Sequence, residues 1–140
     1  MVLEAIKQTK VTMQVYAAIF VVEGDDTAYT RQKTALFSAL NTYGFDSVAG
    51  ITVGNEFMLN YCLEHKCNTP DDRIGQAGSV LLNAKITDVK TTLAGLGGKA
   101  ALLPVGTADA GAFFSTAVLQ QVEYGSVSSA LAIRRKLTIP

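Results

Sequence analysis

The sequence feature that most restricts the fold is an apolar run that ends in glycine and is followed by an amide and a carboxylate. Residues 48–53 are β-branched, apolar or small, Gly54 interrupts them, and Asn55 and Glu56 come next. Such runs are typical of strands buried on both faces, as in parallel sheets. Because α/β barrels carry their chemistry at the carboxyl ends of strands, Asn55 and Glu56 are candidate functional residues. The same pair could instead open a loop and cap the next helix.

The rest of the chain alternates strand-like and helix-like segments. We expect strands at 11–22, 48–54, 100–105 and 123–127. We expect helices at 28–43, 69–96 and 113–122, and a loop or short helix at 57–69. Repeated strand–helix units predict α/β architecture with a parallel sheet. No glycine-rich phosphate motif follows a strand, so a nucleotide-binding fold has no support.

The segment 69–96 is the longest predicted helix. We expect Thr69 as its N-cap, with Pro70 at the first helical position. Its buried stripe should consist of residues at helical spacing. These are Ile74, Ala77, Val80, Leu81, Ala84, Ile86, Val89 and Leu93.

Composition excludes several classes of partner. The 140 residues are 49% hydrophobic and 17% charged, as in one globular domain. Twelve basic and twelve acidic side chains cancel, so there is no basic face for nucleic acid or anionic lipid. The longest apolar run, 15–22, is too short to cross a bilayer. We expect neither a nucleic-acid nor a membrane partner.

The two cysteines and the single histidine lie close together in the sequence. Cys62 and Cys67 flank Glu64 and His65, which could in principle bind a metal. Closed zinc sites need two ligand pairs, and no second pair is present. We therefore expect no metal and no cofactor, and either a local disulfide or two ordinary thiols. His65 lacks a serine or cysteine partner for a triad, so we expect it on a surface loop.

Acidic residues follow three of the predicted strands. Glu23, Asp25 and Asp26 follow the first strand, Glu56 the second and Asp109 the third. In a parallel sheet these positions share one rim, where two carboxylates across a cleft can hydrolyse a glycosidic bond. For Asp25 and Asp26 a solvated helix-capping loop is the favoured interpretation, because such caps are common. Glu56 is the strongest candidate.

The segments around these acids resemble family 17 glycoside hydrolases, the secreted β-1,3-glucanases and glucanosyltransferases of plants and fungi, with the fungal branch more similar. Segment 48–56, with Val-Gly-Asn-Glu, is similar to the family's fourth barrel strand. Segments 11–22 and 103–111 are similar to its third and fifth strands. The resemblance covers roughly residues 1–125 and about strands three to six.

The resemblance implies a partial (β/α)8 TIM barrel of about four βα units. Residues 1–127 would form this half-barrel domain, and 128–140 would be a C-terminal tail unlike the family. By the resemblance, Glu56 matches the general acid/base and Asn55 the residue that bonds the sugar 2-hydroxyl. The further residues that could line the glucan groove are Tyr16, Glu23, Phe57 and Asp109.

One departure from the family bears on activity. No segment matches the nucleophilic glutamate of a later strand, and retaining chemistry needs two carboxyls about 5 Å apart. We therefore expect a truncated β-1,3-glucan-active protein, weak or inactive in hydrolysis. The alternative is a non-catalytic glucan-binding or protein-interaction protein of the immunomodulatory type. Secretion or cell-wall location follows from the resemblance alone.

Four parallel strands cannot close a barrel by themselves. Open sheet edges and a large apolar face drive association. Two copies related by a twofold axis would supply eight strands. The sequence therefore predicts a homodimer with a rebuilt barrel-like core.

Overall fold

The computed structural model describes residues 2–127, so the predicted tail at 128–140 lies outside the described residues. In chain order the elements are α1 (Val2–Thr9), β1 (Val15–Ile19), α2 (Asp26–Tyr43), β2 (Val48–Asn55), α3 (Phe57–His65), α4 (Arg73–Leu96), the 3₁₀ turn η1 (Ala100–Leu102), β3 (Val105–Asp109), the 3₁₀ turn η2 (Gly111–Phe113), α5 (Thr116–Leu119) and β4 (Tyr124–Val127).

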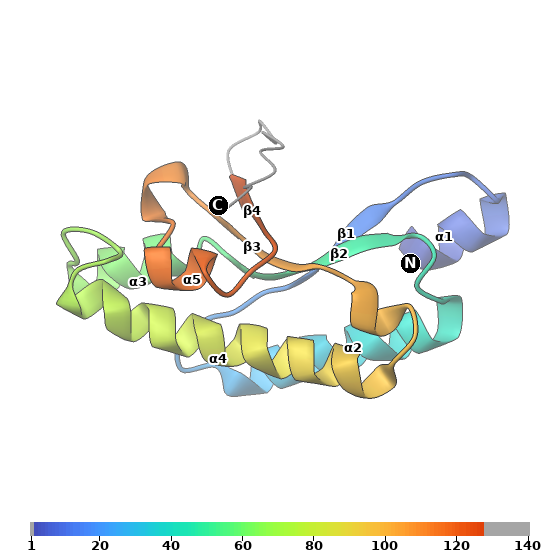
Figure 1. Cartoon of the computed structure of the whole chain (residues 1–140), viewed down its shortest axis with the longest axis horizontal. Coiled ribbons are helices and arrows are strands. Elements are labelled where there is room, and N and C mark those ends of the chain that lie inside the picture. The colour runs from blue at the N-terminus through green and yellow to red at the C-terminus, as the bar shows by residue number, and fades with distance from the viewer. Residues whose placement is uncertain (1, 128–140) are drawn as a thin grey trace.

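The strands form one parallel sheet in the order β1-β2-β3-β4. Each strand therefore pairs with the strand that follows it in the chain. The long helices α2 and α4 lie on the same side of the sheet, and α3 and α5 lie near the carboxyl ends of the strands (Figure 1). This arrangement is a partial (β/α)8 barrel of about four units, and it confirms the predicted fold class.

The core lies between the sheet and its two long helices. Ile51 and Val53 of the inner strand β2 are fully buried. They belong to one cluster with Leu40 of α2 and with Leu82 and Ile86 of α4, all without exposed surface. Burial of such side chains stabilises each by about 1.5–3 kcal/mol relative to exposure. The helices α2 and α4 are therefore held against the sheet by this buried apolar contact.

The buried face of α4 differs from the predicted stripe. Ile74, Val80 and Leu81 are exposed, whereas Gly75 and Gly78 face the core. A Cβ at position 78 would lie 2.5 Å from the ring of Tyr61, and one at 75 would lie 2.4 Å from the carbonyl oxygen of Pro70. The two glycines therefore let α4 approach its neighbours closely. The prediction is confirmed at Ile86, Val89 and Leu93, which are buried, and was wrong in the first half of the helix, because apolar periodicity gives glycine no weight.

Several helices and strands begin or end at other residues than predicted. The cap of α4 is Asp72, whose carboxylate accepts from the N–H groups of Ile74 and Gly75, so the predicted cap at Thr69 was wrong. Strand 11–22 shortens to β1, the third strand moves from 100–105 to β3, and helix 113–122 shrinks to α5. The fourth predicted strand matches β4. The 3₁₀ turn η1 occupies the apolar stretch that we assigned to the third strand.

Two tyrosines cover the sheet face opposite the helices. The rings of Tyr16 and Tyr124 meet edge to face at 5.1 Å, and the hydroxyl of Tyr124 is 2.9 Å from that of Thr52. Tyr124 lies over Gly106, where an added Cβ would be 2.3 Å from its ring. A Cβ at Gly50 would lie 3.0 Å from the Tyr124 ring and 3.1 Å from the Tyr16 ring. The glycines therefore provide the space in which these aromatic rings pack.

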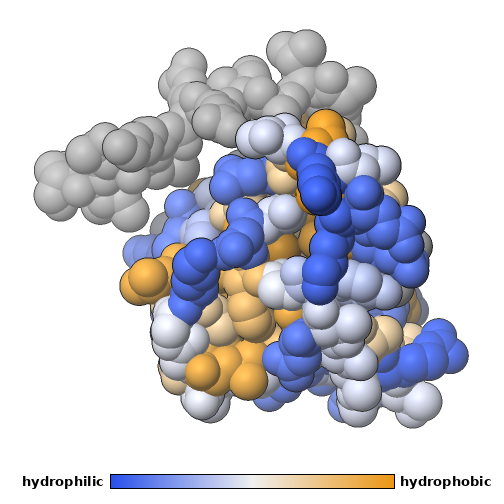
Figure 2. All heavy atoms as spheres, turned by 90° about the vertical axis from the view of Figure 1, so that its right-hand side faces the viewer, coloured by the Kyte–Doolittle hydropathy of each residue, from blue (hydrophilic) through white to orange (hydrophobic). Residues whose placement is uncertain are grey.

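Figure 2 views the end of the molecule at which α1 lies. Hydrophobic surface occurs there only in separate areas, with hydrophilic side chains between them. Within residues 2–127, no helix combines the length and apolar character that crossing a bilayer requires.

The contact between Gly106 and Tyr124 predicts a stability effect. Gly106→Ala should lower the free energy of unfolding by about 1–3 kcal/mol, because its methyl group must displace the Tyr124 ring. Urea unfolding followed by circular dichroism measures the change. Gly95→Ala is the control, since a Cβ there meets nothing within 4 Å in α4 and should stabilise by up to about 1 kcal/mol. Equal effects at both positions would contradict this interpretation.

Candidate active site

The carboxyl end of β2 presents Asn55 and Glu56 through two left-handed backbone positions. Gly54 has φ 80°, and Glu56 has φ 54° and ψ 30°. The N–H of Glu56 donates to the carbonyl of Ala108 at 2.9 Å, and its own carbonyl accepts from the N–H of Asn60 at 3.0 Å. A left-handed residue other than glycine costs on the order of 1 kcal/mol. The strained turn is thus held by hydrogen bonds to β3 and α3.

The side chain of Glu56 does not cap the helix that follows. Glu56 occupies the N-cap position of α3, but its carboxylate makes no capping hydrogen bond. The interpretation of Glu56 as a helix cap is therefore wrong for its side chain. Backbone strain concentrates at functional positions, and here it orients a carboxylate that has no part in capping.

The capping group of α3 is Asp109, at the end of β3. Its carboxylate accepts from the N–H groups of Met58 at 2.8 Å, Leu59 at 3.2 Å and Ala110 at 2.9 Å. Burial raises the pKa of Asp109 above its ordinary value, although these three hydrogen bonds act in the opposite direction. With 1% of its surface exposed, Asp109 lies beneath the rim instead of lining a groove as expected.

The predicted groove residues do not all reach the rim. Tyr16 pairs with Gly50, five residues before Asn55, so it lies about 16 Å from the carboxyl end of β2 along the sheet. Tyr16 is 53% exposed and lies on the face without helices. Asn55 is half-buried, and within residues 2–127 its side chain has no hydrogen-bond partner. The structure therefore places Asn55 and Glu56 together and Tyr16 apart from them.

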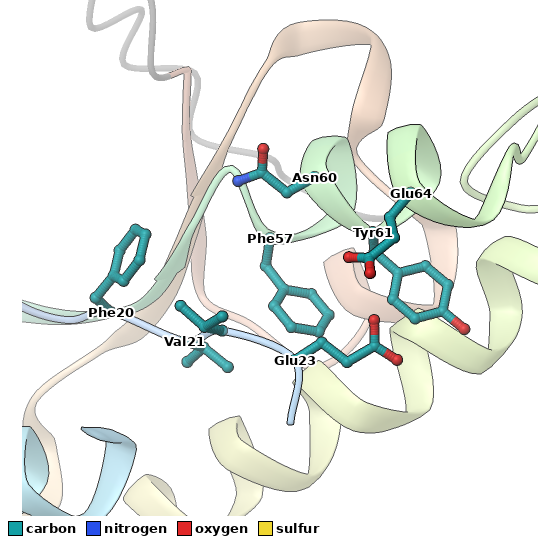
Figure 3. Close-up of a pocket in the computed structure, with 8 residues that line it drawn as sticks. Phe20, Val21, Glu23, Phe57, Asn60, Tyr61 and Glu64 are labelled. Carbon is teal, nitrogen blue, oxygen red and sulfur yellow. The ribbon is translucent and has the colours of Figure 1, made fainter. Parts of the chain in front are cut away.

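Glu23 and Phe57 border a small pocket between β1 and α3. The pocket has a volume of about 80 Å³, and Asn60, Tyr61 and Glu64 also line it. Figure 3 shows the Phe57 ring with Val21 on one side and Glu23 and Tyr61 on the other. Glu23 Oε2 lies 2.7 Å from His65 Nε2, so the histidine that we expected on a surface loop belongs to a contact at the end of α3. No local pattern predicts this contact, because the two residues are 42 positions apart.

Cys62 and Cys67 are free thiols in the structure. Burial, with a contribution from the hydrogen bond to Cys67, raises the pKa of the Cys62 thiol to about 12. A thiol with such a pKa stays protonated near neutral pH and is a poor nucleophile. Of the two alternatives that the sequence left open, the structure corresponds to the pair of thiols.

Comparison with known proteins gives a fold and no family. Neither a protein-family model nor a curated protein matches the sequence. Among solved structures, the chain is similar to an active-site mutant of Rhizomucor miehei β-1,3-glucanosyltransferase in complex with laminaritriose. The TM-score is 0.61 at 21% identity, and the match covers 90% of this chain. The chain spans 39% of the length of that neighbour. This likeness supports a partial TIM-barrel fold and identifies no family, family 17 included.

Because the Asp109 carboxylate accepts three hydrogen bonds, we expect its replacement by the neutral asparagine to destabilise the protein. Asp109→Asn should lower the free energy of unfolding by about 1–3 kcal/mol, since an amide NH₂ replaces one of two acceptor oxygens in a buried site. Denaturant unfolding measures the change. Asp25→Asn is the control, because Asp25 is an exposed N-cap whose carboxylate accepts one hydrogen bond, from the N–H of Ala28, and asparagine caps equally well. A loss no larger than that of the control would contradict the role of Asp109.

Proposed function

We propose that the protein acts on β-1,3-glucan at the carboxyl end of its sheet, with Glu56 as general acid/base. The observation that carries the proposal is the strained turn at the end of β2, which orients a carboxylate not used for capping. The position fits a barrel enzyme, whose catalytic residues come from strand ends. The fold similarity to a glucanosyltransferase that binds laminaritriose supports the substrate class. The resemblance of segment 48–56 supports a family 17 relative of the fungal type.

The proposed roles follow from the chemistry of the two side chains. Glu56 transfers a proton to the glycosidic oxygen as the bond breaks. The amide of Asn55, without a partner in residues 2–127, donates to the sugar 2-hydroxyl. Because β-1,3-glucan is a wall polysaccharide, we place the protein outside the cell or in the cell wall.

Turnover should be slow, because the described residues offer no good nucleophile. Retaining hydrolysis needs a second carboxylate about 5 Å from the first. Asp109 is buried under three backbone N–H groups, and Glu23 pairs with His65. For the catalytic function we therefore propose weak hydrolysis with retained glucan binding.

A second candidate function is glucan binding without catalysis. The face without helices exposes aromatic rings at Tyr16 and, just after β1, Phe20. Such rings bury a large apolar area, and Tyr16 keeps its orientation through Tyr124. In a monomer, this surface could hold a glucan strand independently of Glu56.

Assays of hydrolysis and binding on laminarin distinguish the catalytic function from the non-catalytic one. Glu56→Gln should reduce reducing-end release about 100-fold or more and keep binding, because general acid/base catalysis contributes at least that factor. Glu4→Gln on α1, at the other end of the sheet, is the matched control (Figure 1). Unchanged release in Glu56→Gln would refute the catalytic role. Binding without any release by the wild type would favour the non-catalytic function.

We also propose that a second copy of the chain covers the face without helices. β1 and β4 are the edges of the described sheet, and both run parallel, so the β4 of one copy could continue into the β1 of another. Two such sheets give the eight strands of a closed barrel. Exposed side chains on and beside β1, including Tyr16, Phe20 and Val22, supply apolar area for this contact.

Sedimentation should therefore show a dimer at micromolar concentration. Phe20→Lys should shift it toward monomer, because a charge would be buried in the interface. Leu102→Lys is the matched control, since Leu102 is 82% exposed on η1, away from this face, and should leave the dimer intact. A folded wild-type monomer at this concentration would exclude the proposal.

A further inference from the structure

A cluster of metal-ligand type lies where the segment after β1 meets the last turn of α3. Glu23 follows β1, whereas Glu64 and His65 belong to the last turn of α3. One ligand atom from each residue lies within 4.8 Å of the other two. Figure 3 shows the Glu23 and Glu64 carboxylates turned toward each other beside the Tyr61 ring. Three ligands from two separate segments thus converge on one point.

We propose that Glu23, Glu64 and His65 bind a divalent cation, with Zn²⁺ as the best fit. In a tetrahedral zinc site with bonds of about 2.0 Å, neighbouring ligand atoms are about 3.3 Å apart. His65 Nε2 and Glu23 Oε2 are now 2.7 Å apart, and no pair exceeds 4.8 Å. Small side-chain movements therefore complete three of the four corners, and water takes the fourth.

The electrostatics of the site favour a cation. Two carboxylates and a neutral imidazole carry a charge of −2, which a divalent ion balances. The carboxyl end of a helix also carries partial negative charge, and Glu64 and His65 lie at that end of α3. Within residues 2–127 no lysine or arginine forms an ion pair with Glu23 or Glu64.

The ligands are positioned by their neighbours. The His65 ring packs on the Tyr61 ring with centroids 4.3 Å apart, and Tyr61 is itself buried. This contact restricts the imidazole plane, as groups behind metal-binding histidines commonly do. Glu64 has no hydrogen bond or ion pair in the described chain, so its carboxylate can turn toward an ion without losing one.

The adjoining pocket has the size of an ion with its waters. Glu23 and Glu64 both line it, and its volume is about 80 Å³. Pockets for small organic ligands usually hold about 300–1,000 Å³. A volume of 80 Å³ instead accommodates a few water molecules. The pocket therefore supplies room for the water ligand and a path for exchange.

This inference replaces the expectation of no metal. The sequence argument sought a second ligand pair near Cys62 and Cys67, whereas the third ligand comes from Glu23, 42 positions before His65. The thiols are not part of the cluster. The proposal does not depend on glucan, so it stands or falls separately from the proposed function.

Zinc titration of the untagged protein tests the site, by calorimetry and by NMR of the imidazole. His65 is the only histidine, so its ring signals report directly on coordination. We expect one Zn²⁺ per chain and a shift of those signals. Glu64→Gln and His65→Gln should each weaken binding about tenfold or more, a typical effect of altering a metal site. Circular dichroism verifies that both variants fold.

Two controls distinguish this site from others. Glu4→Gln matches the carboxylate change on α1, and Cys67→Ser tests capture of zinc by the thiols. Both should bind zinc as the wild type does. Unmoved imidazole signals at millimolar Zn²⁺ would overturn the proposal. Binding that survives Glu64→Gln and His65→Gln, or that disappears in Cys67→Ser, would overturn it as well.

Discussion

The carboxylate of Asp109 is the contact on which the carboxyl end of the sheet depends. It joins the end of β3 to the first turn of α3 through the N–H groups of Met58 and Leu59. Those groups would otherwise be buried donors without acceptors, at a cost of about 1–3 kcal/mol each. Because α3 begins directly after Glu56 and ends at His65, one buried carboxylate positions both the candidate active site and the proposed cation site.

Local sequence patterns predict the architecture of this chain well and its packing poorly. The apolar run before Gly54 identifies β2, since a strand covered on both faces needs apolar residues throughout. The buried face of α4 is different, because Gly75 and Gly78 face inward where Tyr61 and Pro70 require space. Glycine contributes nothing to apolar periodicity, so the hydrophobic pattern predicts Ile86, Val89 and Leu93 on that face and misses its glycine-containing first half.

The same distinction applies to the candidate site. Asn55 and Glu56 lie at the rim as expected, because a strand followed by polar residues specifies that position locally. The burial of Asp109 depends on where the first turn of α3 lies, which the sequence of β3 does not specify. The meeting of Glu23 with His65 depends on the register of β1 against β2 and on the length of α3. Such information exists only in the assembled fold.

The order of the strands has a consequence for how the chain folds. Each strand pairs with the next one in sequence, so every pairing closes only the loop formed by one connecting segment. Shorter closures cost less entropy before the contacts form, and they raise folding rates relative to sheets with distant pairings. Synthesis on the ribosome delivers β1, β2, β3 and β4 in the order in which they pair. The sheet can therefore grow one unit at a time during translation, because each new strand adds to the edge that the previous strand left.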